Sequence, residues 1–429
     1  ALLRRVARYA GAAPAATLAS LDAALLTLLE DSVEAYLTTG SVDRRNAIHR
    51  SLQGIENLSL DLLAAVVLHG GTFEDVPAGD TVETYALPGG EKREVIVSVP
   101  RGYTPDRRWP VLIHLHGTNA SLDLCRQWCP YYQDLSRGRF LVLQPVSARN
   151  SGWGPMKIGE QQAPAALRHA RGRFPIDPDR VWIAGQSMGS HGTWHQAMRH
   201  GDLYAAFLPK SGTPYGAYGR NWKAYLDNLR LAPAWSIHGS KDPMFPIATP
   251  REFWAICDDR GLNVKHFEYD VGHEGAPETE IRKSFDWMVE QTRDVYPKSY
   301  SWTADHLDFM RCWWIEGTRF DDTIPRDRVQ FSDQEKKPVE TRMILQTPAT
   351  FSVSVDGQEI RLKTTGLTKL RVLWSPHVVD LAKEVKIFVN GRQRWKGIPE
   401  RSIRQMLEEA RLTGRRDVVF YGSVEVDAK

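Results

Sequence analysis

The chain has 429 residues, 42% of them hydrophobic, and its 55 basic and 52 acidic residues leave a net charge of +3. Because one hydrophobic core rarely serves so many residues, we expect two domains, or one large domain with appendages. The arginine pairs are scattered and lie outside aromatic clusters, which argues against a nucleic-acid partner. No uninterrupted run of about 18 apolar residues occurs, so the sequence predicts no membrane span.

The first 75 residues predict a small helical region. Apolar side chains from Leu18 to Tyr36 recur at three- and four-residue steps, and a second such pattern runs from Arg44 to His69 before Gly70 and Gly71. The sequence leaves open whether this region packs on the main domain or pairs two chains.

Between residues 80 and 295, short apolar runs alternate with helical patterns. We predict strands at 93–100, 110–116, 140–144, 181–185, 206–209, 234–238 and 264–271, and helices at 121–136, 160–172, 188–200, 221–230, 249–260 and 278–292. This alternation predicts an α/β domain with a mostly parallel sheet covered by helices on both faces. Active sites in such sheets lie at the carboxyl ends of the strands.

The rhythm changes near residue 296. Residues 296–334 are rich in tryptophan and charge and predict a packed connector. From 335 to 429 we predict an antiparallel β domain with one helix near 400–412, because alternating runs at 351–355 and 385–389 are each followed by a turn pair, Asp356-Gly357 and Asn390-Gly391.

The pentapeptide Gly185-Gln186-Ser187-Met188-Gly189 lies between an apolar strand and a helical pattern. Small residues on both sides of a serine suit a sharp turn that exposes the hydroxyl. The pattern predicts that Ser187 is a nucleophile at a strand-to-helix turn.

A serine nucleophile needs a histidine base and an acid that orients the base. Asp242 follows the strand at 234–238 in the segment His238-Gly239-Ser240-Lys241-Asp242-Pro243, and His273 follows the next strand in Gly272-His273-Glu274-Gly275. The order serine, acid, histidine predicts Asp242 and His273 as the partners of Ser187. Asp270 is a rival acid, but it lies within a strand only three residues before His273, so we favour Asp242.

An oxyanion hole needs backbone N–H groups near the nucleophile. We predict Met188 as one donor and Thr118 as the other, with Gly117 as an alternative to Thr118. His116 and Gly117 are also predicted to line the substrate, together with Trp153 as an aromatic plate after the strand at 140–144. His114 and His116 would share one side of a strand and could imitate a metal pair, but no third ligand is in sight, so we favour packing.

The cysteines do not indicate a bound metal. Cys125, Cys129, Cys257 and Cys312 are too few for a disulfide framework and lack the paired spacing of a zinc site, although one disulfide stays open. The predicted chemistry requires no metal and no organic cofactor.

Residues 80 to 295 resemble an α/β-hydrolase of the esterase type, similar to the feruloyl esterase and polyhydroxybutyrate depolymerase-like group that is also called the prolyl oligopeptidase family. The resemblance lies in Leu115-His116-Gly117, in residues 179–189 around Ser187, in His238-Gly239-Ser240-Lys241-Asp242 and in Gly272-His273. It implies the same three roles, with Ser187 as nucleophile, His273 as base and Asp242 as acid. It does not define the acyl group or the alcohol.

These observations predict a serine carboxylic-ester hydrolase that works through an acyl-enzyme, on a small-molecule or polysaccharide-linked ester such as a feruloyl ester. Two alternatives stay open. One is a serine peptidase of the prolyl oligopeptidase type, which the short N-terminal region disfavours because it cannot form a β-propeller. The other is a non-catalytic protein that binds carbohydrate or protein on a hydrolase core.

The resemblance and a first residue that is not Met favour a secreted or periplasmic location over a cytoplasmic one. A homo-oligomer stays open.

Overall fold

The computed structural model describes residues 23–71, 73–118, 120–147, 152–154, 157–215, 219–332 and 338–429. At its centre lies an eight-stranded sheet made of β1 (Gly79–Ala86), β2 (Lys92–Val99), β3 (Trp109–Leu115), β4 (Leu141–Pro145), β5 (Ile176–Gln186), β6 (Ala206–Lys210), β7 (Ala234–Gly239) and β8 (Val264–Tyr269). The strand order is β1-β2-β4-β3-β5-β6-β7-β8. β2 pairs antiparallel with β1 and β4, and all other neighbours are parallel.

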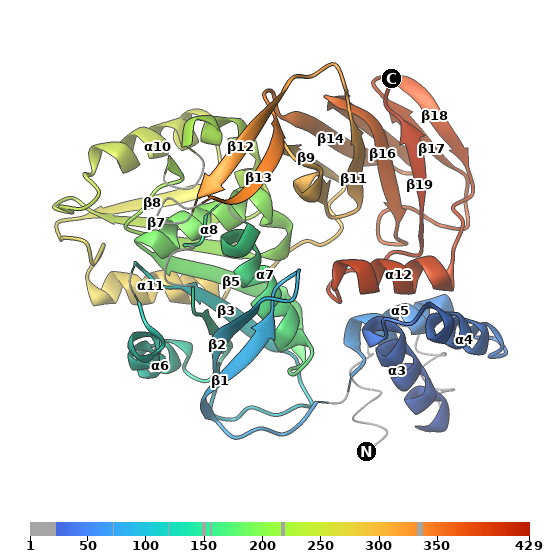
Figure 1. Cartoon of the computed structure of the whole chain (residues 1–429), viewed down its shortest axis with the longest axis horizontal. Coiled ribbons are helices and arrows are strands. Elements are labelled where there is room, and N and C mark those ends of the chain that lie inside the picture. The colour runs from blue at the N-terminus through green and yellow to red at the C-terminus, as the bar shows by residue number, and fades with distance from the viewer. Residues whose placement is uncertain are drawn as a thin grey trace.

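Helices cover both faces of this sheet (Figure 1). They are α6 (Leu122–Ser136), α7 (Lys157–Arg171), α8 (Met188–Arg199), α10 (Ala248–Asp259) and α11 (Glu278–Met288), with the 3-10 helices η1 (Gly201–Leu203) and η2 (Gly219–Arg230). Alternate strand residues enter different cores: Val111 and Ile113 pack with α7, α8 and α10, whereas Leu112 packs with α6 and α11. This strand order with two covered faces is the α/β-hydrolase fold, so the predicted fold class is confirmed.

The predicted strands and helices of this part agree with the structure to within a few residues. β1 was not predicted, because most of its side chains are exposed and its sequence lacks apolar alternation. Residues 221–230 form a 3-10 helix rather than an α-helix.

A second β region follows, formed by β9 (Ser299–Ala304), β10 (Arg311–Cys312), β11 (Ile315–Phe320), β12 (Arg326–Ser332), β13 (Pro338–Leu345), β14 (Ala349–Asp356), β15 (Glu359–Thr365), β16 (Leu367–Trp374), β17 (Val385–Val389), β18 (Arg392–Gly397) and β19 (Gly422–Asp427), with η3 (Leu307–Phe309) and α12 (Ile403–Thr413). Its sheets have the orders β10-β11-β16-β19, β12-β13 and β18-β17-β15-β14-β9. β15 and β17 pair in parallel, and the other pairs are antiparallel. The stretch 296–334 thus contributes strands to these sheets, and its Trp302 and Trp314 are fully buried.

The N-terminal helices α3 (Ala23–Thr38), α4 (Val42–Gln53) and α5 (Leu60–His69) pack on α12, as Figure 1 shows. The Tyr36 hydroxyl donates to Glu408 on α12 at 2.8 Å. The single helical pattern predicted from Arg44 to His69 is wrong, because Gly54 ends α4 and Ser59 caps α5 by accepting from the N–H of Leu62.

A buried charge cluster joins the hydrolase domain to the second β region. Asp417 accepts from Arg171 at 3.3 Å, from Arg293 at 2.8 Å and from Arg415 at 2.7 Å. Burial alone would raise the pKa of Asp417, but the three guanidinium groups hold it well below its usual range. The two parts therefore depend on each other for the charge balance of their interface.

Among the helices in the described ranges, none is both long and apolar enough to cross a membrane.

Candidate active site

Ser187 forms the junction between β5 and α8 and has strained backbone angles. Its φ of 57° and ψ of −121° lie outside the regions that non-glycine residues normally occupy. Its N–H donates to the carbonyl of Lys210 at 2.9 Å, and its side chain makes no capping hydrogen bond to α8. The turn thus keeps the hydroxyl available instead of using it to cap the helix.

The glycines of the pentapeptide allow this sharp turn. A Cβ atom at position 189 would lie 1.9 Å from the carbonyl oxygen of Leu115, and one at position 185 would lie 2.2 Å from the carbonyl oxygen of Gly189. Both contacts are with backbone, which cannot move aside easily. Any larger residue at these positions would push Ser187 away from the end of β3.

Asp242 and His273 meet at the carboxyl ends of β7 and β8. The Nδ1 atom of His273 lies 2.7 Å from Oδ2 of Asp242, and the Asp242 side chain is fully buried while that of His273 is 24% exposed. The other carboxylate oxygen accepts from the backbone N–H groups of Met244 at 2.8 Å and Phe245 at 3.0 Å. Asp242 is therefore fixed in place and presents one oxygen to the imidazole.

The protonation state of Asp242 follows from these contacts. Burial alone would raise the pKa of Asp242, but the hydrogen bonds from His273, Phe245 and Met244 hold it below its usual value. Asp242 is therefore an ionised acceptor at neutral pH, as a carboxylate that orients an imidazole must be.

Asp270, the rival acid, does not contact His273 in the structure. Its carboxylate is 77% exposed and pairs with Lys241 at 2.9 Å. The structure therefore brings Asp242, and not Asp270, to the imidazole.

Two side chains that the sequence did not single out for this role hold the backbone of His273. Gln186, next to Ser187, donates its amide N–H to the carbonyl of His273 at 3.1 Å, and the Ser211 hydroxyl donates to the same oxygen at 3.0 Å. Ser211 has a φ of 57°. These contacts bind the histidine loop to the turn that carries Ser187.

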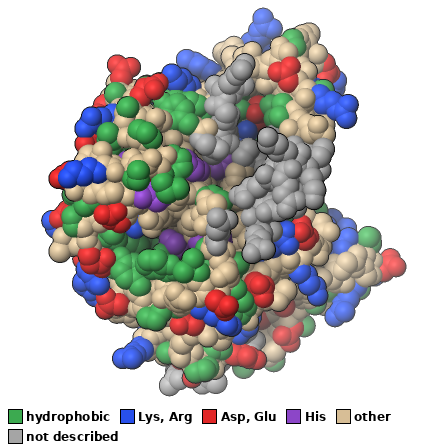
Figure 2. Space-filling model, turned by 60° about the vertical axis from the view of Figure 1, so that its left-hand side comes forward, with side chains coloured by type: hydrophobic (Ala, Val, Ile, Leu, Met, Phe, Trp, Pro, Cys, Tyr) green, Lys and Arg blue, Asp and Glu red, His purple; other side chains and the backbone are tan. Residues whose placement is uncertain are grey.

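A further layer around Asp242 was also missed. His238 lies with its Nε2 atom 2.8 Å from the carbonyl of Phe245 and 3.5 Å from Oδ2 of Asp242. The Phe245 ring lies 5.8 Å from the His273 ring and 5.0 Å from the ring of His191 on α8. Figure 2 shows histidine side chains gathered in a hollowed part of this face. The only sequence signal for His238 was its position four residues before Asp242.

The loop after β3, which carries the predicted second oxyanion donor, lies beside Ser187. A Cβ atom built on Gly117 would be 3.6 Å from Cβ of Ser187, and Thr118 is exposed. His116 is buried: Nδ1 lies 2.7 Å from the carbonyl of Gly117, and Nε2 accepts from the N–H of Ser147 at 3.0 Å. Burial lowers the pKa of His116, so the ring is neutral and braces the loops after β3 and β4.

Trp153, predicted as an aromatic plate, packs inside the domain. It is 2% exposed, its indole N–H donates to the carbonyl of His116 at 2.9 Å, and its ring meets the His116 ring edge-on at 4.9 Å. In the structure Trp153 therefore supports the loop after β3 from below and offers no open face.

The rings of His114 and His116 contact different parts of the domain. Its ring packs on Tyr132 of α6 at 4.5 Å, and burial, together with Lys210 and His116, lowers the pKa of His114 to about 3. Among the described residues, no group of three or more His, Cys, Asp or Glu side chains is arranged to hold a metal ion. The cysteines of the described chain are buried free thiols.

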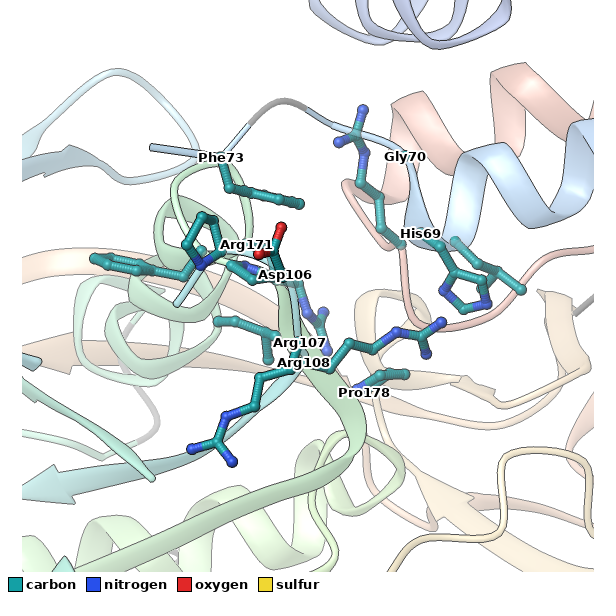
Figure 3. A pocket seen from close by; sticks show the side chains of 14 residues that line it. His69, Gly70, Phe73, Asp106, Arg107, Arg108, Arg171 and Pro178 are labelled. Carbon is teal, nitrogen blue, oxygen red and sulfur yellow. The ribbon is translucent and has the colours of Figure 1, made fainter. Parts of the chain in front are cut away.

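A basic pocket lies at the opposite edge of the sheet (Figure 3). This cavity of about 40 Å³ is lined by His69, Asp106, Arg107, Arg108 and Arg171, close to the first residues of β3 and β5. Burial and the nearby Arg108 lower the pKa of His69 to about 3. The pocket lies at the amino ends of the strands, so it is separate from the cluster around Ser187.

Comparison with known proteins gives one curated relative of note. No family model matches the chain. The bifunctional acetylxylan esterase/xylanase XynS20E of Neocallimastix patriciarum is 27% identical over 249 residues, which are 50% of this chain and 36% of that protein. The chain therefore spans about a third of the length of this relative. The match confirms the resemblance to esterases that the motifs indicated.

Solved structures of esterases are similar over about half of the chain. A thermostable esterase has 25% sequence identity and a TM-score of 0.41, with 50% of this chain and 63% of that chain covered. A ferulic acid esterase has 18% identity and a TM-score of 0.42, with 49% and 99% covered.

Proposed function

We propose that this protein is a serine hydrolase of carboxylic esters that works through an acyl-enzyme. The observation that carries the proposal is the 2.7 Å contact between His273 and the buried Asp242, in a loop that is hydrogen-bonded to the strained turn of Ser187. A nucleophile, a base and an acid from three loops at one sheet edge are what this chemistry requires.

In this mechanism the Ser187 hydroxyl attacks the ester carbonyl while Nε2 of His273 accepts its proton. The imidazolium then returns the proton to the leaving alcohol, and the acyl group stays on Ser187. Water, activated by the same imidazole, releases the carboxylic acid. Asp242 holds the Nδ1–H tautomer and stabilises the imidazolium, which its low pKa supports.

The negative oxygen of the tetrahedral intermediate needs donors beside Ser187. Met188 begins α8, so its N–H lies at the positive end of the helix dipole. Thr118, with Gly117 as the alternative, supplies the second N–H in this proposal, supported by the closeness of Gly117 to Ser187.

The proposed substrate class is based on the name of the relative. Its name couples an acetylxylan esterase with a xylanase, so we propose an acyl group, acetyl or aryl, on a plant polysaccharide. A secreted or periplasmic location, where such polymers occur, is part of the same proposal.

The test is an ester panel on the wild type and on Ser187→Ala. We expect the wild type to hydrolyse 4-nitrophenyl acetate, methyl ferulate or acetylated xylan, and Ser187→Ala to lose roughly 10⁵-fold or more in kcat. Ser240→Ala, which removes a hydroxyl from a neighbouring loop, should keep full activity. Cleavage of aminoacyl-anilides instead of esters would favour a peptidase, and full activity of Ser187→Ala would refute the proposed nucleophile.

A further inference from the structure

A large cavity lies between the hydrolase domain and the five-stranded sheet. Its volume is about 630 Å³, within the range of small-molecule sites. Arg230 and Leu231 line it from the hydrolase side, just before the first residue of β7. The cavity therefore opens near the amino edge of the central sheet, away from the Ser187 turn.

The opposite wall is a regular polar array. In the register of three neighbouring strands, Ser354 of β14 pairs with Ser299 of β9 and Arg361 of β15, and Ser352 pairs with Ser301 and Lys363. Alternate residues of a strand share one face, so the two rows face the same side, and all six side chains line the cavity. Neighbouring strands lie about 4.8 Å apart and the rows roughly 6.6 Å apart.

The serine rows lie on the exposed or half-buried face of the sheet, whereas the opposite face carries the buried side chains of Phe351 and Leu362. Four positions of this array hold a hydroxyl. Each hydroxyl can donate and accept a hydrogen bond. This array can therefore form hydrogen bonds with a ligand that itself carries many hydroxyl groups.

One end of each row carries a cation. Arg361 pairs with Glu359, and Arg230 across the cavity pairs with Asp227. Lys363 has no ion-pair partner among the residues that the structure describes, and Asp294 is the acidic lining residue. The cavity therefore has an unbalanced positive charge at the end of the Ser301–Ser352 row, which suits a carboxylate.

Trp313 also lines this cavity. It lies in the two-residue turn between β10 and β11 with a φ of 47°, where small residues are preferred, and its ring packs edge-on against Tyr300 at 4.8 Å. Its indole N–H is buried and has no hydrogen-bond partner in the described part of the chain. Trp313 and Tyr300 therefore form an aromatic edge of the cavity.

We propose that this cavity binds a segment of an acidic oligosaccharide, with its hydroxyl groups on the serine rows and a carboxylate on Lys363. This binding does not rest on the proposed function of the Ser187 site.

The test uses the full chain with Ser187→Ala, so that no ester is turned over, and isothermal titration calorimetry. The probes are tetragalacturonate as the acidic oligosaccharide and xylotetraose as the neutral one. We expect tetragalacturonate to bind at least tenfold more tightly than xylotetraose, and Lys363→Gln to weaken tetragalacturonate binding about tenfold. Lys383→Gln, on a 70% exposed side chain outside the cavity, should leave binding unchanged.

A second variant tests the cavity without changing its charge. Ser352→Val suits a strand and fills part of the space, so it should abolish binding in the same background. In a chain with Ser187 intact, Lys363→Gln and Ser352→Val should both hydrolyse 4-nitrophenyl acetate like the wild type, which shows that they fold. Equal affinity for both tetrasaccharides, no binding of either, or no effect of Lys363→Gln would overturn the proposal while leaving the esterase proposal intact.

Discussion

The carboxyl edge of the central sheet and the serine face of the five-stranded sheet both gather polar side chains, but they do so by different routes. At the edge, Ser187, Asp242 and His273 come from three separate loops, and atoms of Asp242 and His273 approach to 2.7 Å. On the face, strand register spaces the groups about 5 Å apart. The first spacing lets a carboxylate orient an imidazole through a direct hydrogen bond, whereas the second leaves room for a ligand between the groups.

The two regions share a cost to the fold, because each contains a non-glycine residue with a positive φ, Ser187 in one and Trp313 in the other. At Ser187 the surrounding loops are held by hydrogen bonds from Gln186 and Ser211. Strain therefore persists where neighbouring contacts define the conformation more strongly than the residue itself does.

If the carboxyl edge performs the chemistry, Asp242→Asn should have the largest effect. The amide cannot hold the same imidazole tautomer, so we expect kcat to fall by about 10⁴-fold with little change in stability. Asp270→Asn is the matched control, because this carboxylate follows the next strand but contacts Lys241. Steady-state kinetics on 4-nitrophenyl acetate would measure both variants, and equal losses would contradict the assignment of Asp242.

The buried charge cluster around Asp417, which joins the hydrolase domain to the second β region, should have the next largest effect. Asp417→Asn takes the carboxylate away from the buried guanidinium groups of Arg171 and Arg293, while Arg415 keeps its ion pair with Asp202, and we expect the free energy of unfolding to fall by about 3–5 kcal/mol. Because the pKa of Asp417 is depressed in the folded protein, its contribution is present above the unfolded value of about 3.8 and is lost as the pH falls below it.

Urea unfolding at pH 7 would measure the effect of Asp417→Asn. Asp356→Asn, at an exposed turn of the second β region, is the control and should change stability by less than about 0.5 kcal/mol. A similar loss of unfolding free energy in both variants would show that the cluster does not stabilise the contact between the hydrolase domain and the second β region.

The core behind the carboxyl edge should make the protein sensitive to acid. Burial lowers the pKa of His114 to about 3, so between pH 6.5 and 3 the unfolded chain binds a proton that the folded chain does not. Stability is therefore lost as the pH falls through this window, by up to about 1.4 kcal/mol per pH unit for this group. In His114→Leu the slope of unfolding free energy against pH should be smaller by that amount, and an unchanged slope would contradict it.

The smallest effect concerns a turn of the second β region. Asn390 and Gly391 have φ values of 50° and 80°, and the Asn390 side chain accepts from the N–H of Thr364 at 3.0 Å. Asn390→Ala should cost about 1–2 kcal/mol of unfolding free energy. Asn390→Gly keeps the backbone conformation and loses only the side-chain contacts, so thermal unfolding should rank it between Asn390→Ala and the wild type.

Local patterns predicted the elements well. The apolar runs gave the strands from β2 to β8, and the turn pairs after 355 and 389 marked the ends of β14 and β17. The polar edge strand β1 was missed because an edge strand needs no apolar alternation, and the break between α4 and α5 was missed because apolar spacing continues across it. The order of Ser187, Asp242 and His273 along the chain was also readable, since each follows a strand.

Other features depend on tertiary structure. The contacts of Gln186 and Ser211, the packing of Trp153 and the docking of the N-terminal helices on α12 join residues far apart in the chain. The polar array of serines likewise depends on the register of β9, β14 and β15. The apolar periodicity of the sequence cannot reveal this register, because it reports only which face of a strand a residue occupies. The sequence by itself determined the elements and the chemical groups, because these follow from local spacing. Only the folded chain decided which groups meet, because long-range packing and hydrogen bonds select one arrangement among many.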